Sequence, residues 1–142
     1  MPIEYHIDRE LNLVLKRFTG DVDIAQLKRH WEELITDNES VSIAAWLTDI
    51  REAKIRYNGP ELERLVRSVI EPRMKGVRWI SAVVVNAGVQ YGVTNQFSVY
   101  ASGKAIVATF LSREEALEWV LKARDERDGT TGADKRIRED AC

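Results

Sequence analysis

A short run of apolar residues near the middle of the chain, Trp79-Ile-Ser-Ala-Val-Val-Val85, constrains the fold more than any other stretch. It is rich in β-branched residues and lacks polar alternation, which is typical of a strand buried on both faces of an α/β sheet. Helical patterns flank it over residues 60–71 and 89–101. A buried strand between two helices predicts a parallel sheet with crossover helices.

Size and composition exclude several classes of protein. The chain has 142 residues, of which 44% are hydrophobic, so it can form one domain with a sizeable core. A formal net charge of -2 does not favour a nucleic-acid partner. Cys142 is the single cysteine, which suits a reducing compartment. The N-terminus lacks the pattern of a signal peptide, and no apolar run approaches the ~20 residues of a membrane span. We therefore expect a cytoplasmic protein.

The N-terminal segment predicts a β-hairpin, with strands at residues 3–8 and 11–18 and a turn at residues 9–10. Leucines at alternating positions of the second strand place Lys16 on its wetter face. Gly20 is expected to end this strand.

The remaining elements alternate between helices and strands. Asp23 is expected to cap a helix over residues 24–36, with Gln26 completing a capping box. The other expected elements are a strand at 43–49, an Arg- and Lys-rich loop at 50–58, a helix over 60–71 opened by Gly59-Pro60 and ended by Pro72, a strand at 105–110, and a last helix started by a capping box at Ser112 and Glu115.

Two segments have less regular patterns. Val89, Val93 and Phe97 share one helical face, which indicates a helix over residues 89–101. The sequence becomes polar from residue 125 onward. We therefore expect a folded domain at 1–124 and a polar tail at 125–142.

The expected order is β-β-α-β-α-β-α-β-α, and its last unit closes on Glu-Ala-Leu-Glu-Trp-Val at residues 115–120. With the Gly20 turn before the first helix, this pattern resembles the SpoIIAA-like family, whose fold is related to STAS and CRAL-TRIO lipid-binding domains. The resemblance covers roughly residues 3–124. It implies one mixed, mostly parallel five-stranded sheet whose βα units succeed one another as a superhelix. It also implies non-enzymatic roles, namely partner binding as in STAS domains, or contact with an apolar ligand or a membrane as in CRAL-TRIO domains.

One STAS feature is missing. STAS anti-sigma antagonists carry an Asp-Ser-x-Gly phosphoacceptor where the strand after the first helix meets the second helix. This chain has Thr48-Asp49-Ile50-Arg51-Glu52 at that place. Asp49 matches the acidic residue, but neither the serine nor the glycine follows it, so we do not expect a kinase-controlled switch.

A sheet whose strands follow chain order has no switch point at which a crevice would open. A pocket is then expected between helices, beside residues 89–101. Right-handed crossovers would place the helices largely on one side of the sheet. The other face, with Val14, Phe18 and Trp46 as candidates, would need a cover, and a homodimer could supply it.

A basic segment supplies the candidate contacts to a ligand. Residues 51–78 hold eight Lys and Arg against four Glu, a pattern that suits either anionic lipid headgroups or a solvated surface. The candidate ligand-binding residues are Asp49, Arg51, Lys54, Arg56, Tyr57, Val89, Val93 and Phe97.

No pattern indicates catalysis, a cofactor or a metal. His6 and His30 lie on separate elements without metal-ligand spacing, and we expect a strand histidine and a solvated helix histidine. The glycines at 88 and 92 match neither dinucleotide-binding nor phosphate-loop spacing. We therefore expect a non-enzymatic binding or regulatory module that contacts an apolar ligand or an anionic membrane surface. The alternatives are a homodimeric protein–protein regulator and, third, an enzyme of unknown class.

Overall fold

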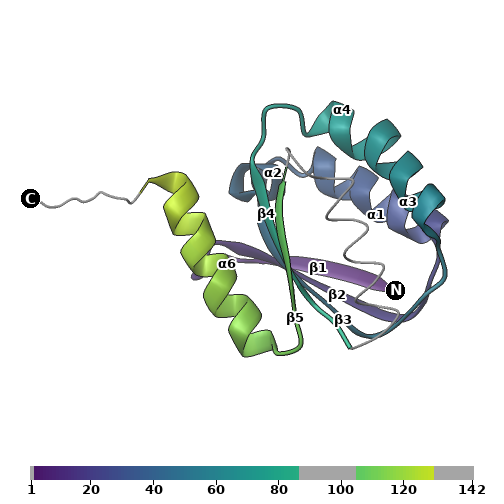
Figure 1. Cartoon of the computed structure of the whole chain (residues 1–142). Helices are drawn as coiled ribbons and strands as arrows, with labels where there is room; N and C mark the ends of the chain where they lie inside the picture. Colours follow the sequence, from purple (N-terminus) through teal and green to yellow (C-terminus); the bar gives the residue numbers. More distant parts are fainter. Residues whose placement is uncertain (1, 87–104, 130–142) are drawn as a thin grey trace, which may run out of the picture.

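The computed structural model describes residues 2–86 and 105–129, which form one five-stranded sheet with helices on both faces (Figure 1). The strands lie side by side in chain order, β1 antiparallel to β2 and all later neighbours parallel. The expected α/β class with a mixed, mostly parallel sheet is thereby confirmed. The strands are β1 (Ile3–Asp8), β2 (Leu13–Val22), β3 (Ala45–Ile55), β4 (Trp79–Val84) and β5 (Ala105–Phe110).

Helices cover the two faces of the sheet unequally. Figure 1 shows α1, α3 and α4 together on one side and α6 on the other. The expected helix at 89–101 lies outside the described residues. The helical segments are α1 (Ile24–Thr36), α2 (Asn38–Ile43), α3 (Gly59–Leu65), the π-helical turn η1 (Val66–Ile70), α4 (Glu71–Arg73) and α6 (Arg113–Asp128).

Side-chain caps begin α1, α2, α3 and α6. The predicted box at α1 is present, because Gln26 N donates to Asp23 Oδ1 and Asp23 N donates to Gln26 Oε1, both at 2.8 Å. Asn58 and Glu61 form an equivalent box at α3, with Gly59 and Pro60 between them. At α6, Glu115 N donates to Ser112 Oγ at 3.4 Å, which is the serine half of the predicted box. Local sequence therefore sets these helix starts.

Pro72 does not end its helix, contrary to the prediction. Glu71 N donates to Val66 O, five residues earlier, so η1 widens the helix by one residue. A wider turn accommodates the proline ring, which would clash with the carbonyl four residues before it in a regular helix. The helix then continues to Arg73.

The second and third strands are longer than predicted. Gly20 lies inside β2 with φ of 67° and does not end it. The expected loop at 50–58 is strand as far as Ile55, because β3 stays paired with β2 beyond a bulge. Arg17 pairs with Asp49 and Thr19 with Glu52, so β3 has one extra residue there. The expected strand start at residue 43 is wrong too, since α2 occupies 38–43 and Ala44 is left-handed with φ of 50°.

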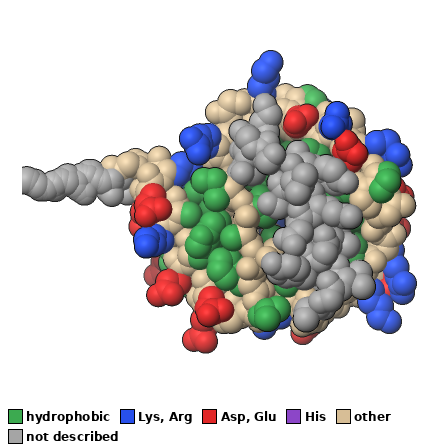
Figure 2. Space-filling view, viewed as in Figure 1, with side chains coloured by type: hydrophobic (Ala, Val, Ile, Leu, Met, Phe, Trp, Pro, Cys, Tyr) green, Lys and Arg blue, Asp and Glu red, His purple; other side chains and the backbone are tan. Residues whose placement is uncertain are grey.

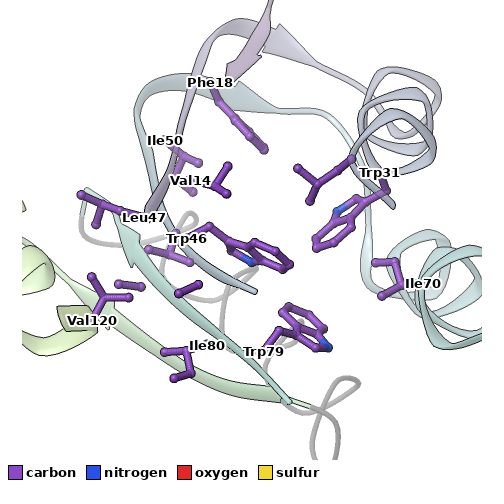
Figure 3. Packing of buried hydrophobic residues seen from close by; sticks show 14 of the residues in the cluster. Val14, Phe18, Trp31, Trp46, Leu47, Ile50, Ile70, Trp79, Ile80 and Val120 are labelled. Carbon is purple, nitrogen blue, oxygen red and sulfur yellow. The ribbon is translucent and has the colours of Figure 1, made fainter. Parts of the chain in front are cut away.

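The sheet face expected to be bare is covered. Val14, Phe18 and Trp46 are buried in the main core on the side of α1 and α3, so they need no second copy of the chain. On the opposite face, Figure 3 shows Leu47 and Ile80 near Val120 of α6.

The last described helix is tied to the sheet by arginines. Arg127 Nη1 donates to Ala44 O at 2.7 Å and Arg78 O at 3.0 Å, and its Nη2 donates to Ile43 O at 2.9 Å. These carbonyls precede β3 and β4, so one guanidinium fixes the starts of two strands to α6. The polar tail was expected from residue 125, but α6 continues to Asp128 and Gly129 caps it with φ of 77°.

No helix within residues 2–86 and 105–129 combines the length and apolar character needed to cross a bilayer.

Candidate functional site

An apolar cavity of about 60 Å³ lies between the sheet and helices α1 and α3. This volume admits a few water molecules or a small ligand. Aliphatic and aromatic side chains make up most of its wall, and a few polar groups interrupt it. Its lining residues are Lys16, Phe18, Leu27, Trp31, Trp46, Thr48, Ile50, Tyr57, Leu62, Ser81 and Val83.

Strand alternation explains why Lys16 lies in this cavity. Side chains two residues apart on a strand share a face, so Lys16 is on the same side of β2 as Val14 and Phe18. Its neighbour on β3 in the parallel register is Thr48. Lys16 is 5% exposed, and the expectation that it occupies a wet face is therefore wrong.

Lys16 is held between two indole rings. Its Nζ lies 4.2 Å from the ring centroid of Trp31 and 4.6 Å from that of Trp46. The two rings meet edge to face at 5.7 Å, and Trp79 lies 5.5 Å from each of them. Figure 3 shows these three tryptophans gathered between the sheet and the helices. The rings fix the direction in which the lysine points.

Desolvation decides the charge of Lys16. No carboxylate in residues 2–86 and 105–129 forms an ion pair with it. Attraction to the indole faces is worth about 2 kcal/mol for a desolvated cation, whereas burying an isolated ammonium costs several kcal/mol. Burial therefore lowers the pKa of the Lys16 ammonium well below its usual value. The site favours a neutral amine, which is a nucleophile and a hydrogen-bond acceptor.

Three hydroxyl groups accompany this amine. Thr48 and Ser81 are both buried and line the cavity from β3 and β4. Tyr57 lines it from the segment before α3, and burial raises the pKa of its phenol, which therefore stays protonated. All three groups can donate a hydrogen bond to a ligand oxygen.

His30 lies close to this cluster but does not line the cavity. It is 4% exposed, so the expected solvated histidine is wrong, and its ring meets Tyr5, Phe18 and Trp31 edge to face. Burial lowers its pKa to about 2. Within the described residues, Nε2 of His30 has no hydrogen-bond partner. The imidazole is neutral and structural at ordinary pH.

The structure separates the residues predicted to bind a ligand. Tyr57 lines the cavity, whereas Asp49 and Arg51 alternate with the lining residues Thr48 and Ile50 and so project from the other side of β3. Arg51 and Asp49 form an ion pair at 2.8 Å. Partial burial opposes ionisation of Asp49, but hydrogen bonds from Arg51 outweigh it and lower the carboxyl pKa.

The other predicted residues do not join Tyr57. Arg56 pairs with Asp21 at 3.2 Å, and Lys54 is exposed on β3. Val89, Val93 and Phe97 lie outside the described residues. Of the described candidates, Tyr57 alone therefore belongs to the cavity.

Sequence reasoning missed Lys16, Thr48 and Ser81. The signal was present, because Lys16 is in phase with Val14 and Phe18, both of which were recognised as apolar. A lysine in phase with such residues is a candidate buried amine. No group of three His, Cys, Asp or Glu that could hold a metal occurs in the part of the chain that the structure describes.

The fold and the cavity define a class: an α/β protein with a mostly parallel sheet and an aromatic-lined cavity that contains a lysine. Comparisons of the chain with models of protein families, with curated proteins and with solved structures find no match.

Proposed function

We propose that this protein is a small, non-enzymatic binding module that holds an apolar ligand in the cavity between its sheet and helices α1 and α3. The observation that carries the proposal is an apolar cavity with a buried amine inside the core. The resemblance to SpoIIAA-like proteins, and through them to CRAL-TRIO domains, supports the same class of function.

The cavity sets the size of the ligand. About 60 Å³ suits a short aliphatic molecule, or the buried end of a longer one. A ligand of about five heavy atoms gains at most about 7 kcal/mol, which corresponds to a Kd no tighter than ~10 μM. Binding should therefore be weak for fragments of this size and depend on contact with the apolar wall.

Polar groups in the wall would orient such a ligand. Nε1 of Trp46 is buried and has no hydrogen-bond partner among residues 2–86 and 105–129. A buried donor without an acceptor is costly, so a ligand oxygen that reaches it would remove this cost. A short molecule with one oxygen at its end, such as an alcohol or a carbonyl compound, matches the cavity best.

Titration with 1-butanol tests the proposal. We expect saturable changes in the backbone NMR signals of residues on β2, β3 and α1 that line the cavity. Ser81→Leu, which fills the cavity, should weaken binding at least tenfold, whereas Ser68→Leu, an exposed change of the same kind on η1, should not affect it. Equal binding by both variants, or no saturable shift in the unmodified protein, would contradict a ligand site in this cavity.

A second candidate function is self-association through β5 and α6, the homodimer alternative. β5 is the edge strand of the described sheet, and Ile106 is 42% and Leu111 64% exposed. Figure 2 shows hydrophobic side chains gathered over α6 on the face drawn there. Light scattering after size exclusion tests this candidate: a dimer that Ile106→Asp converts to a monomer would support it, and a monomer at all concentrations would exclude it.

A further inference from the structure

The side-chain amine of Lys16 lies in the cavity and can react with a ligand as well as contact it. It is 5% exposed, it lies between the rings of Trp31 and Trp46, and none of the carboxylates in the described residues pairs with it. A lysine placed this way has no evident structural role, since a methionine would fill the same space without a polar group. Its presence points to a ligand that reacts with an amine.

The neutral form makes this amine reactive. Desolvation lowers its pKa, whereas a solvated lysine at pH 7 is unprotonated in a fraction on the order of only 10⁻³ to 10⁻⁴. Desolvation in an apolar pocket is a known way to activate lysine toward carbonyl compounds. The geometry selects Lys16 over the exposed Lys28 and Lys54.

We infer that Lys16 forms a reversible imine with the carbonyl carbon of a short apolar aldehyde or ketone held in this cavity. The inference rests on the proposed ligand-binding function and names its ligand class. Reversible capture requires no turnover, so it fits a binding module as well as a carrier.

The reaction balances without a further reagent. The nitrogen lone pair attacks the carbonyl carbon, a C–N bond forms, and the carbonyl π electrons move to oxygen, which takes up a proton while the nitrogen loses one. The hydroxyl of the resulting carbinolamine takes up a proton and leaves as water while the nitrogen lone pair forms the C=N bond, and the nitrogen then releases its remaining proton to give the neutral imine. One amine and one carbonyl compound therefore yield one imine and one water.

The surrounding hydroxyls fit these proton transfers. Thr48 is paired with Lys16 in the register of β2 and β3, and Ser81 and Tyr57 line the same cavity. Because burial raises the pKa of Tyr57, its phenol retains a proton and can donate a hydrogen bond to the carbonyl oxygen. The site thus holds a nucleophile and donors on the walls of one cavity.

Trapping with butanal and cyanoborohydride at pH 7 tests the inference. The reductant converts the imine to a stable secondary amine, and peptide mass spectrometry locates the butyl group. We expect the peptide with Lys16 to be labelled at least tenfold faster than the peptide with Lys28, and Lys16→Met to lose this label alone. Lys28→Met is the matched control and should leave labelling of Lys16 unchanged, and the N-terminal amine is mapped separately.

Two further four-carbon probes separate the possible failures. If 1-butanol binds in the cavity but butanal labels Lys16 no faster than Lys28, the imine is excluded and the binding function remains. If butyrate binds through Lys16 and butanal gives no adduct, the amine forms an ion pair with acids and the inference is overturned. If none of the three probes binds, the proposed function itself fails. Circular dichroism of Lys16→Met and a second variant, Thr48→Val, verifies folding; Thr48→Val should label more slowly than the unmodified protein.

Discussion

The buried amine predicts a specific pH dependence of stability. A base whose pKa is lowered by folding binds a proton more readily in the unfolded chain, so stability rises with pH between the folded and unfolded pKa values. For Lys16 the upper end of this window is the pKa of an ordinary lysine, about 10.4. We therefore predict that Lys16→Met, which removes the amine and keeps the length of the side chain, stabilises the protein below this limit.

The size of this change in the free energy of unfolding follows from the single proton that Lys16 binds. At any pH between the lowered pKa of folded Lys16 and the pKa of an ordinary lysine, the unfolded chain carries a proton on Lys16 that the folded protein lacks. Within this pH range the free energy of unfolding rises by about 1.4 kcal/mol per pH unit relative to Lys16→Met, or by about 2 kcal/mol over about 1.5 pH units. The two stability curves should converge as the pH rises. Tyr5 and Tyr57, whose pKa values burial raises, are present in both proteins, so their contribution cancels.

Urea unfolding at several pH values, followed by tryptophan fluorescence, measures the difference. Lys28→Met is the control, because it removes an exposed lysine from α1, and its curve should run parallel to that of the unmodified protein. A constant gap between the unmodified protein and Lys16→Met from pH 8 to 9.5 would show that folded Lys16 keeps its proton. That result would refute the electrostatic reasoning for the cavity.

Three further predictions concern the stability of the elements that surround the cavity. Arg127→Gln removes three hydrogen bonds from a cation to the carbonyls of Ile43, Ala44 and Arg78. Calorimetry should show the free energy of unfolding lowered by about 2–4 kcal/mol and Tm by about 10 °C. A loss below about 0.5 kcal/mol would show that Arg127 does not hold the strand starts to α6. Asp23→Ala removes the N-cap of α1 and should cost about 1 kcal/mol in urea, with Asp23→Asn nearly neutral. Because the pKa of His30 is lowered to about 2, the free energy of unfolding declines as pH falls below the usual histidine pKa. His30→Phe should reduce the decline between pH 6 and 4 by about 2 kcal/mol. Identical acid sensitivity of the two proteins would argue against a buried neutral imidazole.

Local patterns in the sequence were sufficient to predict several helix starts and the buried central strand. The capping residues Asp23 and Ser112 fixed helix starts, and the continuous apolar run at β4 indicated a buried parallel strand. These features depend on neighbours in sequence, which a single chain displays directly.

The cavity could not be predicted because it depends on contacts between distant residues. Leu13 and Val14 are both fully buried, so alternation along β2 does not reveal which face is wet. The alternation of Leu11, Leu13 and Leu15 placed Lys16 on the solvated face, whereas its phase with Val14 and Phe18 places it on the buried face. Its surroundings are set by Trp31 on α1 and Trp46 on β3, far apart in the chain.

The same reason explains the other errors in the strands. The extension of β3 to Ile55 depends on pairing with β2, where Val22 lies opposite Ile55. The charged residues of the segment, such as Arg51 and Lys54, do not favour strands, so the sequence does not predict this pairing. Arg51 and Arg56 were expected to face a partner, and instead they form ion pairs with Asp49 and Asp21.

The position of α6 has a consequence for biosynthesis. This helix follows all five described strands, and it covers Leu47 and Ile80 and holds the starts of β3 and β4 through Arg127. A nascent chain whose α6 has not yet left the ribosome would therefore present an apolar sheet surface to chaperones. Because Arg127 bonds the carbonyls that precede β3 and β4, these interior strands reach their final stability only after residue 127 has emerged.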